Sequence, residues 1–171
     1  MEVRTNTQPN DVFSVGKRND LLDSFLSNSN GLGNDSLKVD RNLFIEAASK
    51  KNVQFEFIRL KSFQLNKNSF DISNAQNAIL EADYGLADSG KVVVDIQDSD
   101  VLLTIFLAET LHIILPASKI LHSMDDLELI KGKPAIDMGR GITSLLASGS
   151  NRGLSFSPKA LRTMIYVIED L

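Results

Sequence analysis

Residues 91–116 read KVVVDIQDSDVLLTIFLAETLHIILP and hold three short apolar runs, at 91–96, 101–107 and 111–116. Each run is continuous rather than alternating, and β-branched residues or leucines dominate it. Continuous apolar runs of this length are typical of strands that are covered on both faces. We therefore expect three buried strands in a mainly parallel sheet with helices on both faces, which is an α/β fold.

Strand patterns also occur on both sides of these runs. Residues 53–58, VQFEFI, alternate between apolar and polar side chains, which predicts a strand. Residues 142–148 and 162–171 contain two further apolar stretches, and we expect a strand from each. Together with the central runs, these segments would supply the strands of a layered α/β fold.

Three helices are predicted from apolar side chains at helical spacing. The first begins after Asp40, a suitable N-cap. The second covers 75–82 behind Ser73, although this stretch could also become extended near Ala82, and the third covers 117–133. The apolar stripes are Leu43, Phe44, Ala47 and Ala48, then Ala75, Ala78, Ile79 and Ala82, then Ile120, Leu121, Met124 and Leu127.

Residues 1–38 are expected to be a flexible N-terminal segment. Residues 21–26, LLDSFL, could form one or two helical turns, and residues 27–36, SNSNGLGNDS, are typical of a Ser/Asn/Gly linker with no packing face. We therefore expect one α/β domain over 39–171, a length that suits a single hydrophobic core.

The composition excludes several classes of function. The net charge is −4, from 18 basic and 22 acidic residues without a long basic run, so nucleic acid is a poor partner. The chain has no cysteine, which excludes disulfides and thiolate-bound iron–sulfur or zinc sites within it. The polar N-terminus is not a signal peptide, and the longest apolar run, 101–108, is too short to span a bilayer. We therefore expect a cytoplasmic protein without membrane insertion.

Residues 82–94, ADYGLADSGKVVV, contain a candidate binding site at Asp88, Ser89 and Gly90. In one interpretation, the Asp88 carboxylate contacts a substrate and Gly90 allows close approach of the backbone. In the other, the residues form an Asp-x-Gly turn, in which Asp88 bonds to its own backbone and Gly90 takes a positive φ. The chemistry of the residues is compatible with both.

Residues 148–153, SGSNRG, form a second candidate site. Backbone amides of a loop around Gly149 could bind an anion, and Arg152 could grip a carboxylate or phosphate with two hydrogen bonds. The loop is not a nucleotide-binding P-loop, because Gly153 is not followed by Lys and then Ser or Thr. A solvated loop without a ligand is the alternative interpretation.

The chain has two histidines. His112 lies in the run 111–116, where it could face a cleft as an acid or base near pH 7 or be a hydrogen-bonded histidine of the core. His122 lies off the apolar face of its predicted helix and is expected to be exposed. The two histidines do not suggest a metal site.

Three segments, ADYGLADSGKVVV, then ETLHIILPASKIL and the terminal MIYVIEDL, together resemble the LUD domain of the lactate utilisation protein C type. The family carries an acidic or aromatic residue, then Gly, hydrophobic, Ala or Thr, acidic, Ser or Thr and Gly, which corresponds to residues 83–90. The resemblance covers residues 41–171 in pieces, with two departures. The strand–helix unit usual between Ile58 and Ala78 does not fit into this chain, and the late family signature keeps little beyond Gly149.

The resemblance implies the fold of the CoA-transferase and ribose-phosphate-isomerase superfamily, in a shortened form. It places Asp88 where CoA-transferase relatives carry a nucleophilic glutamate. The family implies a part in the oxidation of lactate to pyruvate together with iron–sulfur subunits, and no cofactor of this chain. The role would be that of an accessory component or of a domain that binds a small carboxylate or phosphate-bearing ligand. The alternative is a degenerate, non-catalytic domain for assembly, whose exposed sheet edge is covered by self-association into a homo-oligomer.

Overall fold

The structure is a computed structural model that describes residues 10–67, 76–132, 135–145 and 162–169. Its helices are α1 (Asn10–Gly31), α2 (Arg41–Ala48), α3 (Ser99–Leu107) and α4 (Met124–Lys131), with a short 3₁₀ helix, η2 (Ala117–Lys119). Its strands are β1 (Asp35–Val39), β2 (Phe57–Arg59), β3 (Asn77–Glu81), β4 (Tyr84–Leu86), β5 (Val92–Val94), β6 (Thr110–Pro116), β7 (Ile120–Leu121), β8 (Ala135–Gly139), β9 (Ile142–Leu145) and β10 (Arg162–Ile168).

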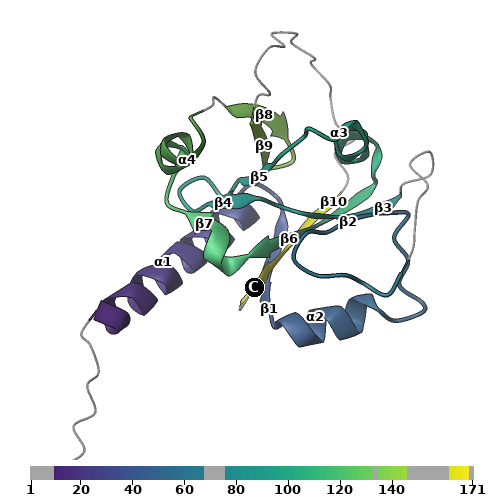
Figure 1. The fold of residues 1–171 in the computed structure, drawn as a ribbon, viewed down its shortest axis with the longest axis horizontal. Coiled ribbons are helices and arrows are strands. Elements are labelled where there is room, and N and C mark those ends of the chain that lie inside the picture. The colour runs from purple at the N-terminus through teal and green to yellow at the C-terminus, as the bar shows by residue number, and fades with distance from the viewer. Residues whose placement is uncertain (1–9, 68–75, 133–134, 146–161, 170–171) are drawn as a thin grey trace, which may run out of the picture.

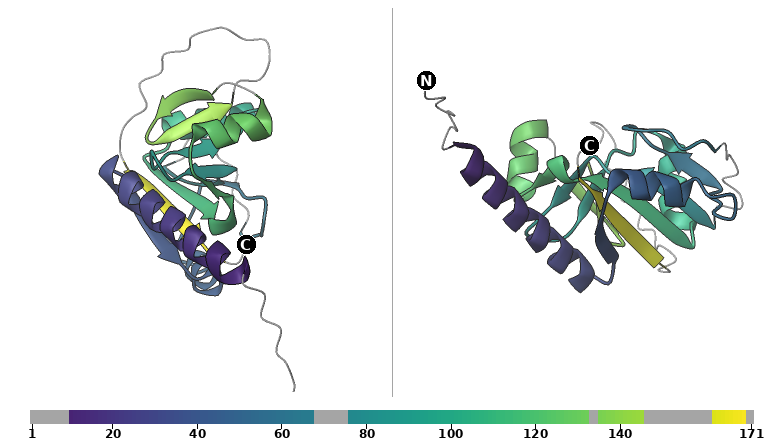
Figure 2. Two further views of the ribbon diagram at one scale, coloured as in Figure 1. Left: turned by 90° about the vertical axis from the view of Figure 1, so that its left-hand side faces the viewer. Right: turned by 90° about the horizontal axis from the view of Figure 1, so that it is seen from below.

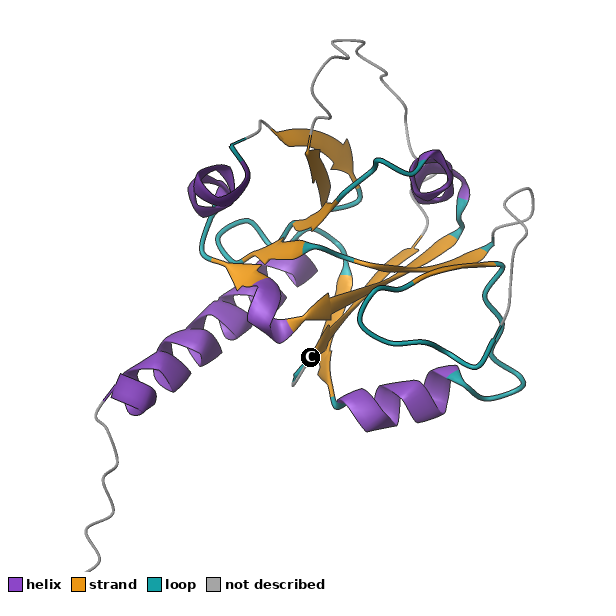
Figure 3. Cartoon of the chain, viewed as in Figure 1, coloured by secondary structure: helices purple, strands orange, loops and turns teal. Residues whose placement is uncertain are grey.

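The described strands form two five-stranded sheets (Figure 3). Sheet A has the order β1-β10-β6-β3-β2, and all of its neighbouring strands run parallel. Sheet B has the order β7-β4-β5-β9-β8 and mixes parallel with antiparallel pairs. The prediction of an α/β fold with a mainly parallel sheet is confirmed by sheet A.

Helices and sheet B cover the two faces of sheet A (Figures 1 and 2). On one face, α2 contributes Phe44, which packs in a cluster with Ile114 of β6. On the other face, Phe25 of α1, Val92 of sheet B and Ile105 of α3 belong to one buried cluster with the opposite side of β6. α4 packs in turn on the outer face of sheet B. Helices therefore lie on both faces of sheet A, as the buried strands predicted.

The second apolar run, 101–107, was expected to be a strand, and that prediction is wrong. The run forms α3, whose N-cap Asp98 accepts a hydrogen bond from the Asp100 amide at 2.9 Å. The connection from β3 to its parallel neighbour β6 has to cross a face of the sheet, and a helix is the usual way to do so. α3 is apolar on both sides, which made it look like a buried strand.

The predicted helix at 75–82 is also wrong, since residues 77–81 form β3. This strand lies between β6 and β2, and Ala78, Ile79 and Leu80 are all buried. A strand buried on both faces has no polar face, so its apolar residues can fit a helical spacing by chance. The helix predicted over 117–133 is confirmed only over 124–131, because Ile120 and Leu121 form β7 beside β4.

The N-terminal residues contribute more to the fold than the expected linker would. Residues 10–31 form α1, which buries Leu22 and Phe25, and β1 pairs in parallel with β10. The linker prediction for 27–36 is wrong, because this segment contains the end of α1 and the start of β1. Its polar side chains hydrogen-bond to one another instead of remaining solvated. Ser36 donates to the buried Ser29 hydroxyl at 2.7 Å, and the Ser36 amide donates to the Asn30 side chain at 2.8 Å. The N-terminal half of α1 projects from the body (Figure 1).

The remaining local predictions are confirmed in part. Asp40 caps α2 by accepting hydrogen bonds from the Asn42 and Leu43 amides, at 2.9 and 3.0 Å. The strand expected at 53–58 is short and begins at Phe57. The terminal strand is confirmed as β10, and the strand expected at 142–148 is confirmed up to Leu145, where the described residues stop. In the part of the chain that the structure describes, no helix is long and apolar enough to cross a membrane.

Candidate functional site

The predicted site at Asp88, Ser89 and Gly90 lies at the tip of the hairpin that joins β4 to β5. Gly90 has a φ of +71°, and its amide donates to the Leu86 carbonyl oxygen at 2.8 Å. The Asp88 amide donates to the His122 carbonyl oxygen at 3.0 Å, and the Asp88 side chain is exposed. The positive φ of Gly90 agrees with the turn interpretation of this motif. That interpretation also had Asp88 bond to its own backbone, whereas the bond seen here runs from the Asp88 amide to His122.

The close backbone approach expected at Gly90 occurs, but to α1. A Cβ atom on Gly90 would lie 2.1 Å from the Ser29 amide nitrogen, so only glycine fits against this part of α1. The Asn28 side chain also donates to the carbonyl oxygen of Ala87, at 2.7 Å. The glycine therefore serves the packing of a helix against a hairpin. The Ser89 hydroxyl oxygen is buried and has no hydrogen bond to a described residue.

Gly149 and Arg152, the second predicted site, lie outside the described residues. The strand that leads toward them is described, and Ser144 of β9 pairs with Val94 of β5. β9 therefore ends beside Asp95, whereas Asp88 precedes β5 and lies at its other end. Ligand binding by Gly149 and Arg152 remains a prediction.

His112 lies on the face of sheet A that α2 covers. Its Nδ1 atom is 3.0 Å from the Tyr166 hydroxyl oxygen, and its ring meets the ring of Phe55 edge-on at 5.3 Å. Burial, with a smaller effect of the Arg162 charge, lowers the pKa of His112 from 6.5 to about 4. The imidazole is therefore neutral near pH 7, and these contacts are those of a hydrogen-bonded core histidine.

A different set of polar side chains gathers at the carboxyl ends of β2, β3 and β6. All strands of sheet A run parallel, so these ends share one edge of the sheet. Ligands of open α/β sheets bind at this edge, because the loops that follow the strands can present polar groups there. The residues that follow the three strands include Lys61, Asp83 and Lys119.

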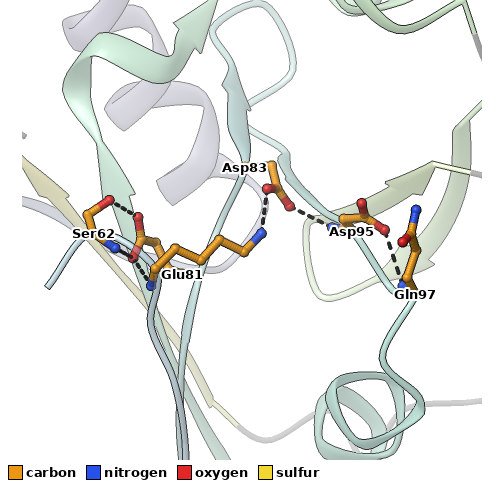
Figure 4. Close-up of polar contacts among 6 residues, drawn as sticks. Ser62, Glu81, Asp83, Asp95 and Gln97 are labelled. Carbon is orange, nitrogen blue, oxygen red and sulfur yellow. Dashed lines mark hydrogen bonds and ion pairs between the residues drawn. The ribbon is translucent and has the colours of Figure 1, made fainter. Parts of the chain in front are cut away.

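Glu81, the last residue of β3, holds the loop that follows β2 (Figure 4). It is only 5% exposed, and its carboxylate accepts hydrogen bonds from the amides of Lys61 and Ser62, at 2.6 and 2.8 Å. The Ser62 hydroxyl donates to its other oxygen. A buried carboxylate with three donors is fully satisfied, so Glu81 positions the loop and is not free to bind a ligand.

Asp83 links this same loop to the segment that follows β5 (Figure 4). It accepts from the Lys61 ammonium at 2.5 Å and from the Asp95 amide at 2.7 Å. The Asp95 carboxylate in turn accepts from the Gln97 amide at 3.1 Å. These acidic groups are held by donors of the protein, and no cluster of metal-ligating side chains occurs among the described residues.

The ammonium groups of two lysines lie over the ring of Tyr84, the residue next to Asp83. The ammonium of Lys119 lies 5.7 Å from the ring centroid, and that of Lys131 lies 5.6 Å from it. Lys119 precedes β7, which pairs with β4 so that Gly85 faces Ile120. Neither lysine forms an ion pair with any residue that the structure describes. Together, Tyr84, Lys119 and Lys131 form a cationic group that can bind an anion, and we call it the Tyr84 site.

A surface pocket occurs at the opposite edge, where the chain enters β2 and β3. It is lined by Ser49, Lys51, Val53, Gln54, Phe55, Glu56, Asn66 and Lys67. The Lys67 ammonium is occupied, because it donates to the carbonyl oxygens of Lys50 and Val53. We favour the carboxyl edge as the functional site, because Lys119 and Lys131 form no ion pair with a described residue and strand topology places ligands there.

The Tyr84 site was not predicted from the sequence. Lys119 and Lys131 are isolated basic residues there, 12 positions apart, with no motif around them. Asp83 and Tyr84 belong to the LUD-like motif, but the predicted site lies in the second half of that motif, at residues 88–90. The signal that could have found the site is the position of Asp83 and Lys119 directly after two apolar runs, at the carboxyl ends of parallel strands.

No family model and no curated protein matches this chain. Among solved structures, the crystal structure of a DUF162 family protein from Deinococcus radiodurans, at 1.70 Å resolution, matches with a TM-score of 0.55 and 11% sequence identity. The match covers 89% of this chain and 98% of that chain. The likeness agrees with the prediction of an α/β fold with a mainly parallel sheet. At this identity the likeness shows the fold alone.

Proposed function

We propose that this chain is a LUD-type domain that binds a small carboxylate or phosphate-bearing ligand at the Tyr84 site. In this proposal it serves lactate utilisation in the cytoplasm, as an accessory component of a system whose iron–sulfur subunits carry the electrons. The motif at 83–90 and the likeness to the DUF162 protein support the family. The observation that carries ligand binding is the pair of lysine ammonium groups on the Tyr84 ring.

The charge of the site supports an anionic ligand. Two ammonium groups near one ring repel each other, and an anion between or beside them removes that repulsion. Asp83 does not neutralise them, because Lys61 and the Asp95 amide already bond to its carboxylate. Both lysines are exposed, so a ligand can reach them from solvent.

Ligand-induced stabilisation tests the proposal. A ligand that binds only the folded chain, at a hundredfold excess over Kd, raises the free energy of unfolding by about 2.7 kcal/mol. We would screen L-lactate, pyruvate, an acyl-CoA and a sugar phosphate for a rise in melting temperature. The double substitution Lys119→Gln with Lys131→Gln should abolish the rise.

Two controls make this test specific. Lys17→Gln with Lys50→Gln changes the net charge equally at exposed positions outside the site, and should keep the rise. Asp88→Ala should also keep it, since the Asp88 carboxylate is on the hairpin tip. Ligand binding that survives the Lys119 and Lys131 substitutions would remove the Tyr84 site from the proposal. The absence of a rise with every compound would count against ligand binding itself.

The outer face of α3 supports the alternative, an assembly module. Leu103 and Leu107 lie one turn apart on this face and are 47% and 52% exposed. An exposed apolar helix face is typical of protein–protein contacts. Light scattering would measure the molar mass of the wild type and of Leu103→Gln with Leu107→Gln. A wild-type oligomer that the substitutions dissociate would favour assembly, and a monomeric wild type would count against self-association.

A further inference from the structure

We infer that the Tyr84 site takes the dianion of a phosphate monoester in preference to a monocarboxylate such as lactate. The inference rests on the proposed function, because it names the ligand class of the same site. Three features support it. They are the two lysine charges without an ion-pair partner among the described residues, the fixed backbone positions of these lysines, and the Tyr84 hydroxyl, which forms no hydrogen bond with a described residue.

The site holds two positive charges that no described carboxylate neutralises. The ammonium groups of Lys119 and Lys131 lie 5.7 and 5.6 Å from the same ring centroid. A monocarboxylate can neutralise one of them and leaves the other unpaired. A phosphate monoester carries close to two negative charges at neutral pH and presents three acceptor oxygens, so it matches the charge of both lysines once their long, exposed side chains close on it.

The acidic residues nearby do not take the place of such a ligand. Asp83 is occupied by the Lys61 ammonium and by the Asp95 amide. Asp125 and Asp126 lie in the first turn of α4, at the other end of that helix from Lys131. The site therefore keeps its two charges for a molecule from solvent.

The backbone around the site is fixed, although the lysine side chains are long. Lys119 directly precedes β7, whose pairing with β4 places it beside Tyr84. Lys131 ends α4, which is anchored by the fully buried Leu127 and closed by Gly132 in the left-handed conformation. Anchored positions lower the entropy that is lost when the lysines close on a ligand.

Tyr84 adds a polar group to the two cations. Its ring is half-buried, and its hydroxyl forms no hydrogen bond with a residue that the structure describes. A tyrosine hydroxyl can donate to a phosphate oxygen, and the ring attracts the two ammonium groups to the same place. The ring, hydroxyl and ammonium groups together match a compact anion of high charge.

Isothermal titration calorimetry with two probes of equal shape tests the charge preference. sn-Glycerol 3-phosphate carries close to two negative charges at pH 7.5, and glycerol 3-sulfate carries one. We expect the phosphate to bind at least about tenfold more tightly at low salt, because its second charge meets the second lysine. L-Lactate should bind as weakly as the sulfate ester.

Substitutions of the two lysines test whether they cause the preference for phosphate over sulfate. Lys119→Gln and Lys131→Gln should each bring the affinities for phosphate and sulfate within about threefold of each other. Lys17→Gln with Lys50→Gln should leave the tenfold preference intact.

Sedimentation with phosphatidylcholine vesicles, with and without phosphatidic acid, distinguishes the source of the phosphate. Lysine-dependent binding to the phosphatidic acid vesicles alone would still support phosphate chemistry, and would assign it to a lipid headgroup.

The outcomes separate this inference from the proposed function. Equal binding of L-lactate, sulfate and phosphate, lost in the Lys119 and Lys131 substitutions, would overturn the inference and leave the proposed function standing. A phosphate preference that survives both substitutions would overturn the inference, because the ligand would bind elsewhere. If a chain that is folded by circular dichroism binds none of the probes or vesicles, both the inference and the proposed function are overturned.

Discussion

The guanidinium of Arg140, in the turn between β8 and β9, donates a hydrogen bond of 2.8 Å to the carbonyl oxygen of Ile105 in α3. It also donates to the Ala108 carbonyl oxygen at 3.0 Å. The last carbonyl groups of a helix have no partner within the helix, and a cation there also interacts favourably with the helix dipole. Burial lowers the pKa of Arg140, but the group stays charged. Arg140 thus ties sheet B to the end of α3.

We expect Arg140→Lys to lower the free energy of unfolding by about 1–3 kcal/mol. The two carbonyl groups are bonded by different nitrogens of the guanidinium, Nη1 and Nη2. The single nitrogen of a lysine cannot occupy both positions, so at least one of the two bonds is lost or weakened. Urea denaturation followed by circular dichroism would measure the change. Arg41→Lys, at an exposed position of α2, is the matched control and should change stability by less than about 0.5 kcal/mol. Equal effects of the two substitutions would contradict a capping role.

Gly90→Ala should destabilise the chain by more than about 2 kcal/mol, because the new methyl group meets the α1 backbone and the φ is positive. Two other glycines separate these causes. Gly33 has a positive φ and open space around it, so Gly33→Ala should cost only about 1 kcal/mol. Gly31, which is helical and in open space, should tolerate alanine without loss. Similar effects at Gly90 and Gly33 would show that the contact with α1 contributes nothing.

His112 should make stability depend on pH. Its pKa is lowered in the folded chain, to about 4 from 6.5, so the unfolded chain binds the proton more readily. The contribution of neutral His112 is fully present above pH 6.5 and is lost as the pH falls from 6.5 through 4. Between pH 7 and pH 5 we expect a loss of about 2 kcal/mol from this group.

Urea denaturation at several pH values would measure this dependence as the difference between the wild type and His112→Gln. Glutamine cannot titrate in this range, so the difference should shrink as the pH falls toward 5. His122→Gln removes an exposed histidine and should keep the wild-type dependence. If His112→Gln and the wild type lose stability in parallel, His112 does not control the acid response.

Glu81→Gln should lower the free energy of unfolding by about 1–3 kcal/mol and loosen the loop at 61–62. An amide keeps the shape of the carboxylate but replaces one acceptor oxygen with a donor, which then faces donors of the loop. Hydrogen exchange should be faster at the Lys61 and Ser62 amides. Glu46→Gln, at an exposed position of α2, should leave exchange at these amides unchanged. Unchanged protection in Glu81→Gln would mean that the loop is held by other contacts.

Several elements of the fold follow from local sequence alone. Asp40 marked the start of α2 because a side-chain acceptor before an apolar stripe is a local signal. The runs at 111–116 and 162–168 became β6 and β10 because their continuous apolar character reports burial on both faces. The positive φ of Gly90 was part of the turn interpretation, one of the two that the motif allowed.

Other features depend on contacts that periodicity does not report. α3 and β3 were assigned to the wrong class, because a segment that is apolar all round has no polar face to set its period. The polar residues Ser29, Asn30 and Ser36 looked like a linker, but they satisfy one another at the end of α1. The Tyr84 site joins three elements that are distant along the chain, and only the strand order brings them together.

The place of β10 has a consequence for the biosynthesis of this protein. β1 is translated long before its one neighbour in sheet A, β10, and Asp35 forms an ion pair with Arg162 across 127 positions. During synthesis, the backbone groups of β1 that pair with β10 therefore stay unpaired until β10 has emerged from the ribosome. A pairing of such long range is slow to form. We expect chaperones that shield nascent chains to aid the folding of this sheet.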